Sequence, residues 1–229
     1  MNSVLLVDPP MALQHHPIGA STGYMAELRG NWDALVEEAC RVSSFAVELA
    51  ALSEPELGPL AEYLATMPAL PFRYLSVHAP SKHRLMSEAE FVAALAALPA
   101  FVDAIVVHPD QIEDATLYRA LGARLVLENM DARKSSGRHG DELEALFAVL
   151  PEAGFCFDIA HAWSVDPEME VGEDLLDRFA ARLRHVHLSS LDEGLSHESL
   201  RAEDEALFEP LLARCRDVPW LLEAPPRLI

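Results

Sequence analysis

Basic residues are scarce in this sequence. Lysine and arginine together number 17 against 37 aspartates and glutamates, and the formal net charge is −20. A protein that holds nucleic acid over a broad surface needs clustered lysine and arginine to neutralise the phosphates. The composition therefore argues against nucleic acid as a partner, although it leaves room for a local anion site.

Cysteines and long apolar runs are also few. Cys40, Cys156 and Cys215 are odd in number and far apart, which fits neither a disulfide framework nor a CxxC metal site. No apolar run approaches the roughly 20 residues of a membrane helix. The N-terminal run at 3–7 is too short for a signal-peptide core. We therefore expect reduced thiols, no membrane partner and a cytoplasmic location.

Short apolar segments alternate with amphipathic ones along the chain. This alternation predicts strands at 18–21, 45–49, 74–77, 104–107, 125–127, 155–157, 186–188 and 220–222. Helical patterns separate these strands, at 32–41, 57–66, 87–97, 113–121, 141–149, 173–182 and 203–215.

Eight strands that alternate with helices predict parallel βαβ units closed into a (β/α)8 TIM barrel, an α/β fold. An open doubly wound sheet is the alternative, but GASTGYM (19–25) lacks its glycine-rich phosphate turn. We see no domain boundary and expect one domain over 1–229. The six residues after Glu223 are too few for an eighth helix. The apolar stretch 1–13, or a partner subunit in a homo-oligomer, would cover the exposed flank.

Side chains that can bind a metal stand at the end of nearly every predicted strand. Barrels place their active sites at the carboxyl ends of the strands, so these side chains would converge at the mouth. Histidine and carboxylate groups together are the usual ligands of zinc, manganese and iron. The sequence therefore predicts a divalent metal site at the mouth, with candidate ligands His78, His108, Glu128, Asp158, His187 and Glu223; Glu48 is a further metal-capable strand end.

The stretch GFCFDIAHAW (154–163) supports this prediction. Asp158 ends a buried strand, and burying an ionised carboxylate is costly unless it is paired, hydrogen-bonded or bound to a metal. His161 follows three residues later and would engage a second group, or a second metal, from the same loop.

Motifs along nearly the whole chain resemble the xylose isomerase-like barrel superfamily, which joins sugar isomerases and epimerases with endonuclease IV-type AP endonucleases. DIAH (158–161) resembles a motif shared across the superfamily, whereas VHAP (77–80), VVHPD (106–110) and LENMD (127–131) resemble the nuclease branch. The sugar branch implies one metal held by Glu128, Asp158, His187 and Glu223. LSHESL (195–200) resembles the loop that gives the nuclease a third-metal histidine, here His197. Leu195 stands where the nuclease has an aspartate, for which Asp192 is a substitute.

The resemblance implies two alternative reactions, of which we favour the first. A metal-dependent isomerase or epimerase of a sugar, sugar phosphate or related hydroxy-ketone would use Glu128 and Glu223 as catalytic proton-transfer groups, with His161 on a substrate oxygen. A phosphodiester hydrolase would use two or three ions, with His78, His108, His161 and His197 as additional ligands. A barrel without catalytic function is a third alternative, but it would not need so many metal-capable strand ends.

Both lysines of the sequence follow proposed ligands in loops at the mouth, Lys82 after His78 and Lys134 after Glu128. Together with Arg138 they predict an anion clamp for a phosphate or carboxylate, and hence an anionic small-molecule substrate. We expect Trp163 to form a wall of the pocket and Glu48 to orient a ligand or the substrate.

Overall fold

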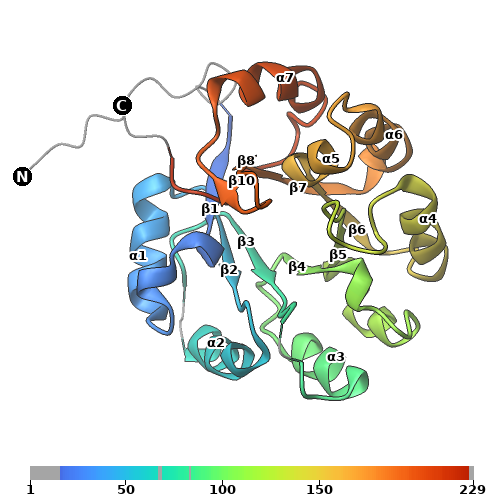
Figure 1. The fold of residues 1–229 in the computed structure, drawn as a ribbon. Helices are drawn as coiled ribbons and strands as arrows, with labels where there is room; N and C mark the ends of the chain where they lie inside the picture. The colour runs from blue at the N-terminus through green and yellow to red at the C-terminus, as the bar shows by residue number, and fades with distance from the viewer. Residues whose placement is uncertain (1–15, 67–68, 83, 227–229) are drawn as a thin grey trace, which may run out of the picture.

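The computed structural model describes residues 16–66, 69–82 and 84–226. Within these residues, eight parallel strands close into a barrel in the order β1-β10-β7-β6-β5-β4-β3-β2, which confirms the predicted TIM barrel (Figure 1). The strands are β1 (Ile18–Ser21), β2 (Ala46–Ala50), β3 (Tyr74–His78), β4 (Ala104–Val107), β5 (Leu125–Glu128), β6 (Gly154–Asp158), β7 (Leu183–Leu188) and β10 (Trp220–Leu222).

Helices connect most consecutive strands and surround the barrel (Figure 1). α1 (Trp32–Val42) begins after Asn31, whose side chain accepts the Ala34 N–H, and α3 (Glu88–Ala96) begins with a capping box of Ser87 and Glu90. The others are α2 (Glu54–Thr66), α4 (Gly140–Val149), α5 (Ile159–Val165), α6 (Glu170–Phe179) and α7 (Ala202–Leu212). The sequence analysis predicted all of these except the short α5.

The prediction of an α-helix at 113–121 is wrong. Leu117–Arg124 instead forms 3₁₀ turns, as do Thr22–Tyr24, Ala26–Leu28, Pro109–Gln111 and Ala180–Arg182. Asp114 accepts the N–H of Thr116 with its side chain, which favours a local turn over an α-helix. Gly122 has a φ of 56°, a left-handed conformation that interrupts helical geometry.

An antiparallel hairpin, β8 (Ser190–Leu191) with β9 (His197–Glu198), follows β7 and was not predicted. The eighth helix is missing as predicted within the described chain, because residues 223–226 after β10 are not helical. The segment 1–13, proposed to cover that flank, lies outside the described residues. Among the helices described here, none combines the length and apolar character needed to cross a membrane.

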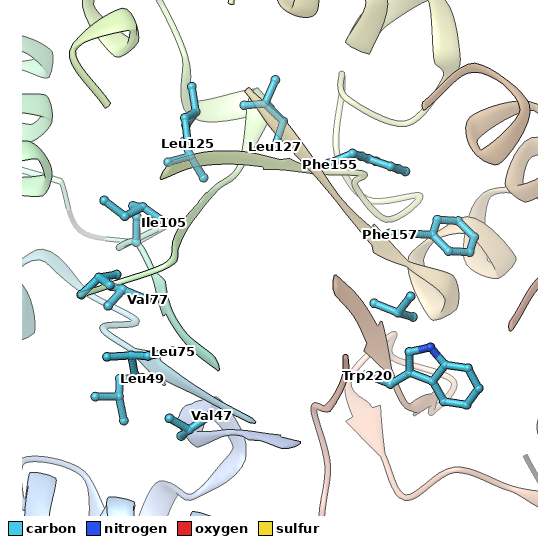
Figure 2. Packing of buried hydrophobic residues seen from close by; sticks show 14 of the residues in the cluster. Val47, Leu49, Leu75, Val77, Ile105, Leu125, Leu127, Phe155, Phe157 and Trp220 are labelled. Carbon is cyan, nitrogen blue, oxygen red and sulfur yellow. The ribbon is translucent and has the colours of Figure 1, made fainter. Parts of the chain in front are cut away.

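Side chains along the barrel strands alternate between two environments. One set points out toward the helices and forms the main core; it includes Val47, Leu49, Leu75, Val77, Ile105, Leu125, Leu127, Phe155, Phe157 and Trp220 (Figure 2). A separate cluster of Ala104, Val106, Val126 and Cys156 comes from the alternate positions of β4, β5 and β6. Because Glu128 and Asp158 continue this inward alternation, the strand ends direct polar side chains toward a common centre.

Candidate metal centre

The carboxyl ends of the strands surround a cavity of about 420 Å³. Asp158 and His187 are buried, and each has a possible ligand atom within 4.8 Å of those of Glu128 and Glu223, which line the cavity. The fold therefore brings all the predicted metal ligands to one place, since the remaining ones, His78, His108, Glu128, His161, His197 and Glu223, line the cavity.

The first ligand group consists of His78, His108 and Glu128. The Nε2 atoms of the two histidines are 3.1 Å apart, and Oε2 of Glu128 lies 3.3 Å from that of His78 and 3.2 Å from that of His108. Two nitrogen ligands of a tetrahedral zinc ion are about 3.3 Å apart, given Zn–N bonds of about 2.05 Å. The three atoms are thus spaced like ligands of one ion.

The second group consists of Glu128, Asp158, His187 and Glu223. Nδ1 of His187 lies 3.2 Å from Oε1 of Glu128, 3.4 Å from Oε1 of Glu223 and 3.9 Å from Oδ2 of Asp158. Glu128 therefore belongs to the first and second groups at once, one carboxylate oxygen facing each. A carboxylate in that position can bridge two metal ions.

Glu48 fixes the orientation of His187. Nε2 of His187 lies 3.2 Å from Oε2 of Glu48, so it donates its proton there and leaves Nδ1 free to ligate. The hydroxyls of Ser21 and Ser76 donate to the same buried carboxylate at 3.3 and 3.0 Å. Burial alone would raise the pKa of Glu48, but the imidazoles of His187, His78 and His185 together outweigh it and lower that pKa to about 2. Glu48 is therefore placed to orient a ligand rather than the substrate.

The third group consists of Asp158, His161 and His197. Nδ1 of His161 lies 2.9 Å from the carbonyl oxygen of Asn129, and Nδ1 of His197 lies 2.7 Å from the Ser189 hydroxyl. These bonds leave the Nε2 atoms free, the usual arrangement around ligating histidines. Burial lowers the pKa of His197 to about 4, so this side chain is neutral near pH 7.

Asn129 positions Asp158, which belongs to both the second and third groups. Its side-chain amide donates to the Asp158 carbonyl and accepts the Asp158 N–H, each at 2.8 Å. Asp158 in turn accepts the N–H of His161 at 2.7 Å and so caps α5. The carboxylate that ends the buried strand β6 thus lies between two ligand groups.

Buried polar atoms that lack a hydrogen-bond partner indicate whether these side chains are suited to bind a cation. Among the described residues, Oδ2 of Asp158 and Oε2 of Glu223 are buried without a hydrogen-bond partner. Leaving such atoms unsatisfied is costly, more so when they are charged. Histidine nitrogens and carboxylate oxygens that converge in this way fit a divalent transition-metal ion.

The two glutamates of the second group have opposite pKa shifts. Burial raises the pKa of Glu223 well above its usual range. Burial also opposes ionisation of Glu128, but His187 and His108 outweigh it and hold the pKa of Glu128 well below its usual range. At Glu128 the histidines outweigh burial, whereas at Glu223 the opposing effect of His187 on the pKa does not.

Of the residues predicted to contact the substrate, some line the cavity and others do not. Lys82 and Lys134 line the cavity, and Lys134 pairs with Asp110 at 2.8 Å. Arg138 is not among the described residues that line the cavity, so its part in the anion clamp stays a prediction. Trp163 packs against the main core instead of forming a wall of this pocket.

Asp192 does not take the place of the missing aspartate. It is exposed in the hairpin turn, where its Oδ1 accepts the N–H groups of Gly194 and Ser196 at 2.8 and 2.9 Å. Leu195 adopts a φ of 58° in the same turn. The third group therefore lacks a contribution from this loop other than His197.

Asp131, which the sequence analysis did not predict as a site residue, lines the cavity together with Arg133. Asp131 is buried, accepts from Arg133 at 2.8 and 3.0 Å, and lies 3.9 Å from Nε2 of His161. The signal was available in the motif LENMD, where Asp131 follows Glu128 by three residues. Arg133 thus contributes a cation where Arg138 had been expected to do so.

Residues 110–218 match the family described as Xylose isomerase-like TIM barrel. This stretch carries Glu128, Asp158, His161, His187 and His197. No curated protein matches the chain.

Among solved structures, endonuclease IV from Thermus thermophilus is similar to this chain, with a TM-score of 0.56 and 24% sequence identity. The similarity covers 85% of this chain and 87% of that one. At this identity the likeness establishes the fold. The family match over residues 110–218 and the shared barrel agree with the resemblance seen in the motifs: this part of the chain is similar to xylose isomerase-like TIM barrels, and the chain has the TIM-barrel fold.

Proposed function

We propose that this protein is a multinuclear metal-dependent hydrolase of a small-molecule phosphoester. The observation that carries this proposal is the sharing of carboxylates between ligand groups. Glu128 joins the first and second groups, and Asp158 joins the second and third. Adjacent ions held by shared carboxylates are typical of enzymes that cleave phosphate esters.

Protein residues have separate tasks in such a site. The three groups would hold zinc, manganese or iron, which supplies Lewis-acid chemistry: it neutralises phosphate charge and makes water more acidic. Glu48, Asn129 and Ser189 hold His187, Asp158 and His197 in ligating orientations. Lys82, Arg133 and Lys134 line the cavity and would bind phosphate oxygens.

A small substrate agrees better with the charge of the chain than nucleic acid does. The net charge of −20 repels a long polyanion, whereas a few cations at the cavity can still bind one phosphate. The likeness to endonuclease IV supports the hydrolytic chemistry as a hypothesis but carries no substrate to this chain.

The second candidate is the metal-dependent isomerase or epimerase. Its full ligand set, Glu128, Asp158, His187 and Glu223, is present as the second group. A mononuclear isomerase, however, has no need of the first group, whose two histidines converge on Glu128. We therefore rank hydrolysis first.

The first prediction concerns metal content. Elemental analysis of the purified protein should give up to three ions per chain from the three mouth groups. His108→Ala should lose one ion, and Asp158→Asn two, because Asp158 belongs to two groups. His139→Ala, an exposed histidine outside all three groups, is the control. One ion in the wild type, unchanged in His108→Ala, would contradict a multinuclear site.

The second prediction separates the two reactions. The metal-loaded protein should release nitrophenol from bis(4-nitrophenyl) phosphate or 4-nitrophenyl phosphate. His108→Ala should lower kcat/KM by at least tenfold, because a lost ligand group removes one ion. An isomerase would instead exchange solvent deuterium into a hydroxy-ketone phosphate and would tolerate His108→Ala. Deuterium exchange without phosphoester cleavage would overturn the hydrolase proposal.

The third prediction concerns substrate charge. Lys82→Ala should raise the KM for an anionic phosphoester about tenfold, the loss of one charge-assisted contact. The KM for a neutral phosphotriester should not change. Arg138→Ala is the control, since Arg138 is not among the described cavity residues. Equal effects of Lys82→Ala on charged and neutral substrates would exclude an anion-binding role for Lys82.

A further inference from the structure

A second set of metal-capable side chains lies one layer below the mouth of the barrel. Cys156 of β6 pairs in register with His185 of β7, just as Asp158 pairs with His187 at the next inward position. Cys156, His185 and His187 are all completely buried. One ligand atom from each lies within 4.8 Å of the other two.

His185 is held in place but not satisfied. Its Nδ1 lies 2.7 Å from the hydroxyl of Tyr74, which fixes the orientation of the ring. Its Nε2 is buried and has no hydrogen-bond partner among the described residues. The surrounding barrel layer is apolar, with Ala104, Val106 and Val126 clustered around Cys156. A buried, unpartnered nitrogen in such a layer indicates an absent ligand.

Glu48 supplies a fourth donor on the same side. Its Oε2 lies 3.7 Å from Nε2 of His185 and 3.2 Å from Nε2 of His187. His187 has its two nitrogens on opposite sides, with Nδ1 toward the mouth and Nε2 toward Glu48. Two imidazoles, one thiol and one carboxylate form a donor set that suits zinc and other thiophilic ions.

We propose that Cys156, His185 and His187 form a second metal site beneath the mouth, for a thiophilic divalent cation such as Zn²⁺ or Cd²⁺. Binding breaks the S–H bond of Cys156, releases the proton to solvent and forms a metal–sulfur bond. Coordination through Nε2 of His187 also displaces the proton that this atom donates to Glu48. That proton leaves to solvent as well, so His187 binds as an imidazolate and Glu48 is free to ligate the ion. The site does not depend on the hydrolase proposal, because three of its four donors take no part in the mouth groups.

Cobalt tests this site directly, because a thiolate bound to Co²⁺ gives a charge-transfer band in the near ultraviolet that imidazole and carboxylate ligands do not. The protein is produced in cobalt-supplemented medium, so that the ion is present while the barrel closes. The wild type should show the band. Cys156→Ala should lose the band and one cobalt ion per chain, and His185→Gln should lose both as well.

Two variants make the result specific. Cys215→Ala, which removes another buried thiol, should keep the band. Asp158→Asn should also keep it while losing ions at the mouth, which separates failure of this site from failure of the hydrolase proposal. Cys156→Ser, closer in size to the native side chain, replaces Cys156→Ala if the latter does not fold. Absence of the band in the wild type, or its persistence in the folded Cys156 variant, would overturn the proposal.

Discussion

Buried negative charge at the mouth of the barrel is the constraint on which the surrounding structure depends. Glu48, Glu128 and Asp158 are almost completely buried, and the side chain of Glu223 is 12% exposed. Concentrating carboxylates away from water is costly unless cations or hydrogen-bond donors compensate them. The histidines and serines around them compensate only part of that charge, and the divalent ions that we propose would supply the rest.

The closed barrel makes this concentration geometrically inevitable. Alternate side chains of each strand point inward, so the residues that end β3, β5 and β6 meet even though they are far apart in sequence. The apolar side chains of the same strands point outward and form the main core (Figure 2). The residues that stabilise the fold and those that form the site are therefore interleaved along every strand.

The sequence predicted the barrel because its strands are short apolar segments with regular spacing. Three strands, Ile18–Ser21, Ala104–Val107 and Trp220–Leu222, have the predicted boundaries. β7 begins at Leu183, three residues before its predicted start. The prediction missed these residues because exposed Arg184 and inward His185 interrupt the apolar pattern. The metal ligands were predictable because a strand end fixes where a side chain lies in a barrel.

Loop residues were less predictable, because their direction depends on contacts that the local sequence does not encode. Arg138 and Trp163 were assigned to the pocket by proximity in sequence. Among the lysines and arginines that the structure describes, only Lys82, Arg133 and Lys134 line it. Glu48 is an intermediate case. Its strand position predicted that its side chain would face inward. Its hydrogen bond to His187, however, could be identified only in the three-dimensional structure.

Anomalous X-ray diffraction at the zinc absorption edge, from crystals grown with zinc, tests the multinuclear centre most directly. The map should show a peak at each mouth group: one between the Nε2 atoms of His78 and His108, one beside Nδ1 of His187, and one near His161 and His197. A peak confined to the group of Glu128, Asp158, His187 and Glu223 would contradict the multinuclear centre and favour a mononuclear isomerase.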